Sequence, residues 1–152
     1  MAAVDQHTQA RYHGCMALSD PATGAARLRL TSLRNGLLKV HKTLLDSERA
    51  RYERDIQRIN SSGQLLSLVL HDPWFAWLHE LSELIVLIDE TMDGEEPASP
   101  SEAGRLLAQA RALLTPAETG EGFRKQYFEA LQRDPDVVIA HGAAMKVLAG
   151  LG

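Results

Sequence analysis

Two histidines, His41 and His141, stand among apolar residues, and they are the first side chains in the chain that could do chemistry. His41 lies beside Leu37 in a helical pattern, and His141 shares 3- and 4-residue spacings with Val137 and Ala144. Such spacings place both imidazoles on apolar helix faces. An imidazole in that position can ligate a metal, bind a small molecule or hydrogen-bond within a core.

Three further polar residues could join the histidines. Glu48 and Tyr52 continue the stripe of His41 seven and eleven residues later, and Asp89 flanks an apolar stripe of its own. If the helices run antiparallel at about 1.5 Å per residue, Asp89 comes to the level of His41, and His141 lies within about one turn of it. We therefore predict a buried polar cluster or ligand site formed by His41, Glu48, Tyr52, Asp89 and His141.

Two interpretations of this cluster stay open. It could be a hydrogen-bonded part of the core, because buried polar groups seek partners, or it could bind a divalent metal or a small ligand. The sequence has no Glu-x-x-His, His-x-x-x-His or His-Glu-x-x-His, which are the usual metal motifs of helices. The one His-x-x-x-Glu, from His79 to Glu83, falls on the polar side of its helix. We predict no cofactor and treat the metal site as the alternative.

No local pattern points to an enzyme. The chain contains no phosphate-binding loop, no Gly-rich strand-to-helix turn and no serine elbow. The aromatic group Trp74, Phe75 and Trp77 spans three sides of a helix, so we expect at least one ring to face away from the local core. These rings either cap the end of a bundle or form a protein–protein contact, where tryptophan is favoured.

The elements that must position these residues are all helical. Residues 25–59 form one long helix, about 50 Å at 1.5 Å per residue, and the most apolar stretch, 72–92, is expected to be the central helix of the fold. Shorter helices are expected at 64–70, 100–114, 123–133 and 135–150, each opened or closed by Pro, Gly, Ser or Asp. The predicted class is all-α, an up-down helical bundle with one over-long N-terminal helix and four to five shorter helices. We expect a mobile N-terminal tail at 1–22 and a single domain at 23–152.

Charge and composition narrow the partners. Residues 1–60 carry a net charge of +4 and the remainder −8, within a total of −4. The basic residues alternate with acidic ones in the pattern of a solvated helix face, so nucleic acid is not an expected partner. The single cysteine, Cys15, fits a cytoplasmic protein, and the richness in Arg, Ala, Leu and Gly suggests a bacterial source. No apolar run is long enough for a membrane span.

The length of the first helix suggests how the protein works. Its ends must overhang a bundle built from shorter helices, and Leu28, Leu38 and Leu45 lie off its main apolar stripe. We therefore predict a non-enzymatic protein that acts through protein–protein association, as a homodimer formed through this helix. The alternative is a metal- or small-ligand-binding bundle with its site near His41, Asp89 and His141.

Overall fold

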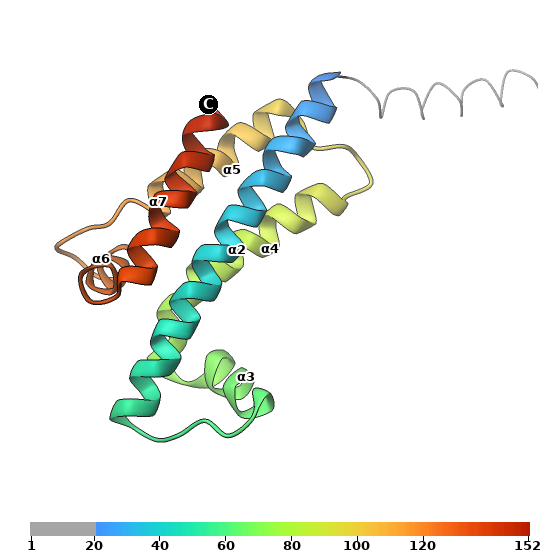
Figure 1. Ribbon diagram of the computed structural model, residues 1–152. Helices are drawn as coiled ribbons and strands as arrows, with labels where there is room; N and C mark the ends of the chain where they lie inside the picture. The colour runs from blue at the N-terminus through green and yellow to red at the C-terminus, as the bar shows by residue number, and fades with distance from the viewer. Residues whose placement is uncertain (1–20) are drawn as a thin grey trace, which may run out of the picture.

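The computed structural model describes residues 21–152, which form an all-α bundle of six α-helices and one 3-10 helix with no strand (Figure 1). The predicted fold class, with one over-long N-terminal helix and shorter helices after it, is confirmed. In chain order the elements are α2 (Pro21–Asp55), α3 (Ser62–His71), η1 (Pro73–Leu78), α4 (His79–Asp93), α5 (Pro100–Leu113), α6 (Phe123–Arg133) and α7 (Pro135–Gly150).

The long helix α2 has the expected length but is displaced by four residues toward the N-terminus. It begins at Pro21, where a proline without an N–H fits the first turn, and ends at Asp55. The predicted tail, 1–22, lies outside the described residues except for its last two, which belong to α2. The predicted apolar stripe is confirmed as far as Tyr52, whereas Ile56 is exposed because the helix has already ended. The buried apolar residues of α2 are Ala26, Leu30, Leu33, Leu37, Val40, Leu44 and Tyr52.

The centre of the fold is α2 and not the apolar stretch 72–92. Helices α4, α5 and α7, together with η1, all pack against α2. The stretch predicted as one central helix is divided into η1 and α4. Its most apolar positions do reach the core, since Leu78, Leu81 and Ile88 are fully buried. Apolarity identified a buried helix, but the longest helix offers the most surface for the others to cover.

Helix α3 stands to one side of the bundle, next to the end of α2 (Figure 1). Ser61 caps it by accepting a 3.1 Å hydrogen bond from the N–H of Gln64, and none of its residues is buried. It packs on η1, and the Nε2 of His79 lies 2.7 Å from the Val69 carbonyl oxygen. We call α3, together with the last turn of α2 and the residue that follows it (52–56), the arm.

The last three helices follow their predicted bounds closely. Ser99 caps α5, accepting a 3.1 Å hydrogen bond from the N–H of Glu102, and Asp134 caps α7 in the same way through Asp136 at 2.9 Å. Proline takes the first turn of both helices. Asp134 joins α6 to α7, and the two helices pack against each other at a large angle (Figure 1).

Within the part of the chain that the structure describes, no helix has both the length and the apolar character needed to cross a bilayer.

Candidate functional site

The predicted polar cluster is divided among three separate pairs and one ion group. His41, on α2, shares a 2.8 Å hydrogen bond between its Nε2 and the Oγ of Ser82 on α4. The same hydroxyl lies 3.3 Å from the Leu78 carbonyl oxygen, so it can donate to either acceptor. Burial lowers the pKa of His41, which favours the neutral ring. The His41–Ser82 pair is therefore an uncharged contact between two helices.

The His41–Ser82 pair lacks the parts of a hydrolytic site. A serine nucleophile needs its histidine oriented by a third group, usually a carboxylate on the other ring nitrogen. Among residues 21–152, no carboxylate is hydrogen-bonded to His41. Ser82 also lies inside α4, where its carbonyl partner Leu78 is one turn away along the same helix. The geometry fits a structural hydrogen bond better than a nucleophile.

Asp89 does not lie opposite His41, and in this respect the expected level is wrong. It forms an ion pair with the Nε of Arg34, whose side chain is about as exposed as its own, 37% against 34%. The rings of Trp74 and Phe75 contact Tyr52, so the chain meets α2 again at the last turn of that helix and not beyond its end. Because the chain meets α2 again near Tyr52, Asp89 lies level with Arg34, two turns beyond His41.

The two polar contacts between α2 and α4 have the same spacing on both helices. Arg34 precedes His41 by seven residues on α2, and Asp89 follows Ser82 by seven residues on α4. Seven residues are about two helical turns, or roughly 10 Å of rise. The pairs Arg34–Asp89 and His41–Ser82 are therefore successive polar contacts along one seam of antiparallel helices.

His141 faces α6 and has its own partner there. Its Nδ1 lies 2.7 Å from the hydroxyl of Tyr127, and the two rings meet edge to face with centroids 5.5 Å apart. Burial raises the pKa of Tyr127 above its usual range and lowers that of His141. The phenol therefore stays protonated and donates a hydrogen bond to the Nδ1 of a neutral imidazole. Both residues stand seven positions from the turn at Asp134, a symmetry in the sequence that could have identified the pair.

Glu48 is the one charged side chain that is fully buried in the described part of the chain, at 1% exposure. Arg51, one turn later on α2, places its Nη1 3.0 Å and 3.2 Å from the two carboxylate oxygens. Arg133, at the end of α6, donates to the same carboxylate. The guanidinium of Arg51 also lies 4.7 Å from the centre of the Trp74 ring. Glu48 thus joins α2, α6 and the aromatic residues of η1 into one ion group.

Tyr52 and the aromatic residues of η1 belong mainly to the core. Phe75 is fully buried and Tyr52 is 4% exposed, and their ring centroids are 5.6 Å apart. Trp74 and Trp77 are partly buried; Trp74 meets Tyr52 edge to face, and Trp77 packs on Phe123. Of the candidate interface residues Trp74, Phe75 and Trp77, Phe75 is therefore not accessible to a partner, because its ring is fully buried.

None of the three predicted ligands His41, Asp89 and His141 is hydrogen-bonded to another of them. Each takes a different partner: Ser82, Arg34 and Tyr127. Across residues 21–152 no group of three or more His, Cys, Asp or Glu side chains is arranged to hold a metal ion. Sequence reasoning did not find Arg34, Arg133 or Ser82, since each becomes a partner only through contact with another helix.

Comparison of the chain with protein-family models, with curated proteins and with solved structures found no match.

Proposed function

We propose that the protein acts through association with a second copy of itself, as a non-enzymatic module, and that the arm is the contact surface. The observation that carries this proposal is the character of α3. It is the one α-helix in residues 21–152 with no Asp, Glu, Lys or Arg, and none of its residues is buried. A helix that is apolar and yet largely uncovered is suited to packing against another molecule.

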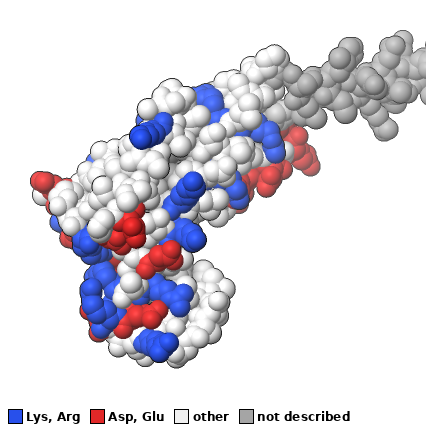
Figure 2. Space-filling view, in the orientation of Figure 1, with Lys and Arg blue, Asp and Glu red and all other residues white. Residues whose placement is uncertain are grey.

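The apolar residues of α3 divide into two faces. Leu65, Leu68 and Val69 are partly buried against the core. Leu66 and Leu70 are 59% and 55% exposed, and their spacing of four residues puts them on one side of the helix. Ile56, just after the end of α2, is 58% exposed as well. Figure 2 shows this end of the molecule as an uncharged surface beside the charged side chains of α2. One face of α3 holds the helix on the bundle, and the other is left for a partner.

A second copy is the partner that the charges of α3 favour. In a two-fold dimer the same patch meets itself, so any charge near the axis faces its own copy. Like charges in contact oppose such pairing by several kcal/mol. Since only His71 in α3 can ionise, two copies of this helix can meet without that cost.

The expected dimer is weak, because α3 is short. Ten residues span about 15 Å, and such a helix alone cannot bury the ~800 Å² per partner of a stable interface. The contact must therefore extend to Ile56, just after the end of α2, with the charged residues Glu53, Arg54 and Asp55 at its rim. We expect a dissociation constant on the order of 10 µM, which corresponds to about −7 kcal/mol. The proposed setting is the cytoplasm.

The test is light scattering or sedimentation at increasing concentration. The wild-type mass should rise from the chain mass of 16.7 kDa toward twice that value. The double substitution Leu66→Glu and Leu70→Glu should hold the mass at that of one chain, because four carboxylates would meet at the axis. Both leucines are exposed, so the fold should survive, as melting would show.

Leu28→Glu is the matched control. Leu28 is 71% exposed near the opposite end of α2, so the same substitution there should leave the dimer intact. A wild-type protein that stays at the mass of one chain up to hundreds of micromolar would refute the proposal. Equal dimerisation in the α3 variant would refute the arm as its surface, and loss in the Leu28 variant would move the contact to the start of α2.

A further inference from the structure

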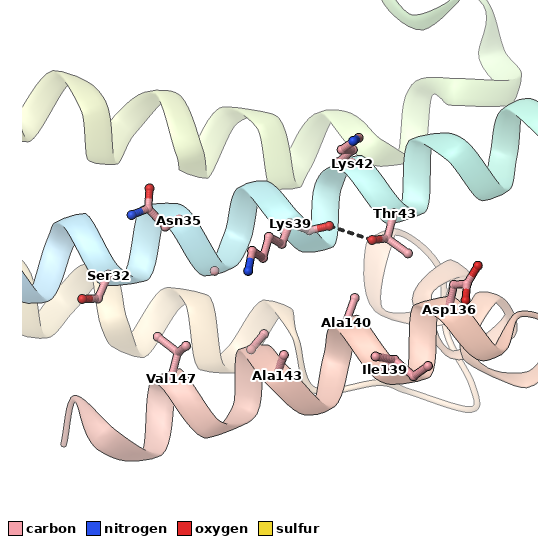
Figure 3. A pocket seen from close by; sticks show the side chains of 12 residues that line it. Ser32, Asn35, Lys39, Lys42, Thr43, Asp136, Ile139, Ala140, Ala143 and Val147 are labelled. Carbon is pink, nitrogen blue, oxygen red and sulfur yellow. Dashed lines mark hydrogen bonds between the residues drawn. The ribbon is translucent and has the colours of Figure 1, made fainter.

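A groove of about 660 Å³ runs between α2 and α7, on the bundle and away from the arm (Figure 3). This volume lies within the ~300–1,000 Å³ of typical small-molecule sites. Its α7 wall is apolar and made of small or branched side chains. Besides Asp136, the α7 residues that line the groove are Ile139, Ala140, Ala143, Ala144 and Val147.

The size of the groove follows from small residues on both helices. Gly36 lines it on α2, and a Cβ added there would come no closer than 3.8 Å to Val147. Ala140 and Ala143 leave space opposite. Ile139, which also lines the groove, is 70% exposed, so a large apolar side chain borders open space. An apolar body placed against α7 would cover this surface.

The α2 wall is polar and carries two lysines, Lys39 and Lys42. Figure 3 shows that Lys39 extends from α2 toward α7, whereas Lys42 points away from α7. Within residues 21–152 the ammonium group of Lys39 has no ion pair. The one acidic residue of the lining, Asp136, lies toward one end, beyond Ala140 in Figure 3.

We propose that this groove binds a small amphiphile with a single anionic group. The apolar body would lie along Ala143 and Val147 on α7, and the carboxylate or phosphate would pair with Lys39. A second anionic group at the far end would meet Asp136, which favours a ligand with one charge. An ammonium beside an apolar wall supplies both the orienting contact and the buried area that such sites use.

A second groove on the same molecule has the opposite charge and therefore serves as an internal comparison. It measures about 440 Å³ and lies between α4 and α5, with Glu80 and Glu83 in its lining. The one cation there, Arg124, already donates from its Nε to the Thr115 carbonyl oxygen. An anionic amphiphile would be repelled from this groove although it is also lined with leucines.

The experiment is calorimetric titration of the full chain with dodecanoate and, separately, with dodecyl phosphate, both below their micelle concentrations. We expect one bound molecule per chain, and the tighter of the two ligands indicates whether the head is a carboxylate or a phosphate. Dodecanol, which has the same tail and no charge, should bind at least about tenfold more weakly, a difference of about 1.4 kcal/mol.

Matched variants locate the site. Lys39→Glu should weaken dodecanoate at least tenfold, whereas Lys146→Glu, at an exposed lysine of α7 outside the groove, should not. Ala143→Trp should fill the groove and abolish binding, whereas Ala112→Trp should fill the acidic groove without effect. Ala143 and Ala112 are both exposed, so neither tryptophan is forced into the core.

Absence of saturable binding to the wild type would overturn the proposal. So would equal affinities for dodecanoate and dodecanol, or binding that survives both Lys39→Glu and Ala143→Trp. The result is independent of self-association, because the Leu66→Glu and Leu70→Glu variant keeps the groove and should bind dodecanoate with unchanged affinity. A failed dimer with intact binding, or the reverse, separates the two proposals.

Discussion

Replacing the buried carboxylate of Glu48 should be among the most damaging single changes in the bundle. Glu48→Gln keeps the volume and shape of the side chain but leaves Arg51 and Arg133 without their anion. The Glu48 side chain is 2% exposed, and each arginine side chain is 29% exposed. The perturbation is therefore the loss of a charge and not the loss of packing.

The magnitude follows from the burial of the partners. Removing one member of a buried ion pair costs about 3–5 kcal/mol, because an uncompensated charge stays behind. The two arginines keep some access to water, which places the expected loss near the lower limit, about 3 kcal/mol. For a chain of this size that loss lowers the melting temperature by roughly 6–12 °C.

The measurement is urea unfolding with thermal melting, and Glu53→Gln is the matched control. Glu53 pairs with Arg49 at i,i+4 on the same helix, but both side chains are partly exposed, 32% and 41%. Such a pair contributes about 0.3–0.5 kcal/mol. If Glu48→Gln and Glu53→Gln lose the same stability within error, the assignment of Glu48 as the ion group that joins α2 to α6 is wrong. A double-mutant cycle with Arg133→Gln should show a coupling of about 1–3 kcal/mol.

Two further predictions concern pH and glycine. Burial lowers the pKa of His41 and His141 in the folded protein. As the pH falls below about 6.5, these histidines therefore take up protons in the unfolded chain before they do so in the folded one. The free energy of unfolding is at its full value above that pH and decreases as the pH falls toward the lowered pKa values of the folded state. Urea unfolding between about pH 7.5 and 5.5 should show this fall, and the double variant His41→Gln and His141→Gln should flatten it, whereas an unchanged slope would exclude the histidines as its source. Gly36→Ala should raise the free energy of unfolding by up to about 1 kcal/mol, since the site has room for a methyl group and a mid-helix glycine is costly. Gly122→Ala should instead lower it, because Gly122 has a φ of +86°, and loss of stability in both variants would contradict the fit at Gly36.

The helices could be predicted from the sequence because capping residues and apolar repeats within each segment indicate a helix. Ser99 and Asp134 cap helices where their spacing indicated, and the 3- and 4-residue repeats of α2 and α7 selected residues that are buried. The end of α2 was placed four residues too late. Ile59 is indeed buried, but it reaches the core from the loop after the helix and not from a helical turn.

The candidate site could not be predicted in the same way, because it depends on how distant segments come to one level. That Glu48 and Tyr52 are buried followed from their stripe on α2. The pairing of Asp89 with Arg34 could not be predicted, because it depends on the level along α2 at which the chain meets this helix again after α3. A polar residue on an apolar face shows that it needs a partner, but the partner is chosen by the contact between helices.

The two polar contacts between α2 and α4, which have the same spacing on both helices, help to fix the register in which these helices pack. Apolar stripes on two helices still match when one helix slides by two turns, so burial alone distinguishes poorly between such alignments. Sliding α4 by seven residues one way would bring Asp89 to Arg27 and Ser82 to Arg34, but it would place His41 against the buried ring of Phe75, where the imidazole has no hydrogen-bond partner. Sliding it seven residues the other way would bring Asp89 to His41 and Ser82 to Glu48, but it would leave Arg34 beyond the end of α4. A half-exposed ion pair contributes little to stability, yet together with the His41–Ser82 hydrogen bond it makes one alignment the only one in which all four side chains are paired.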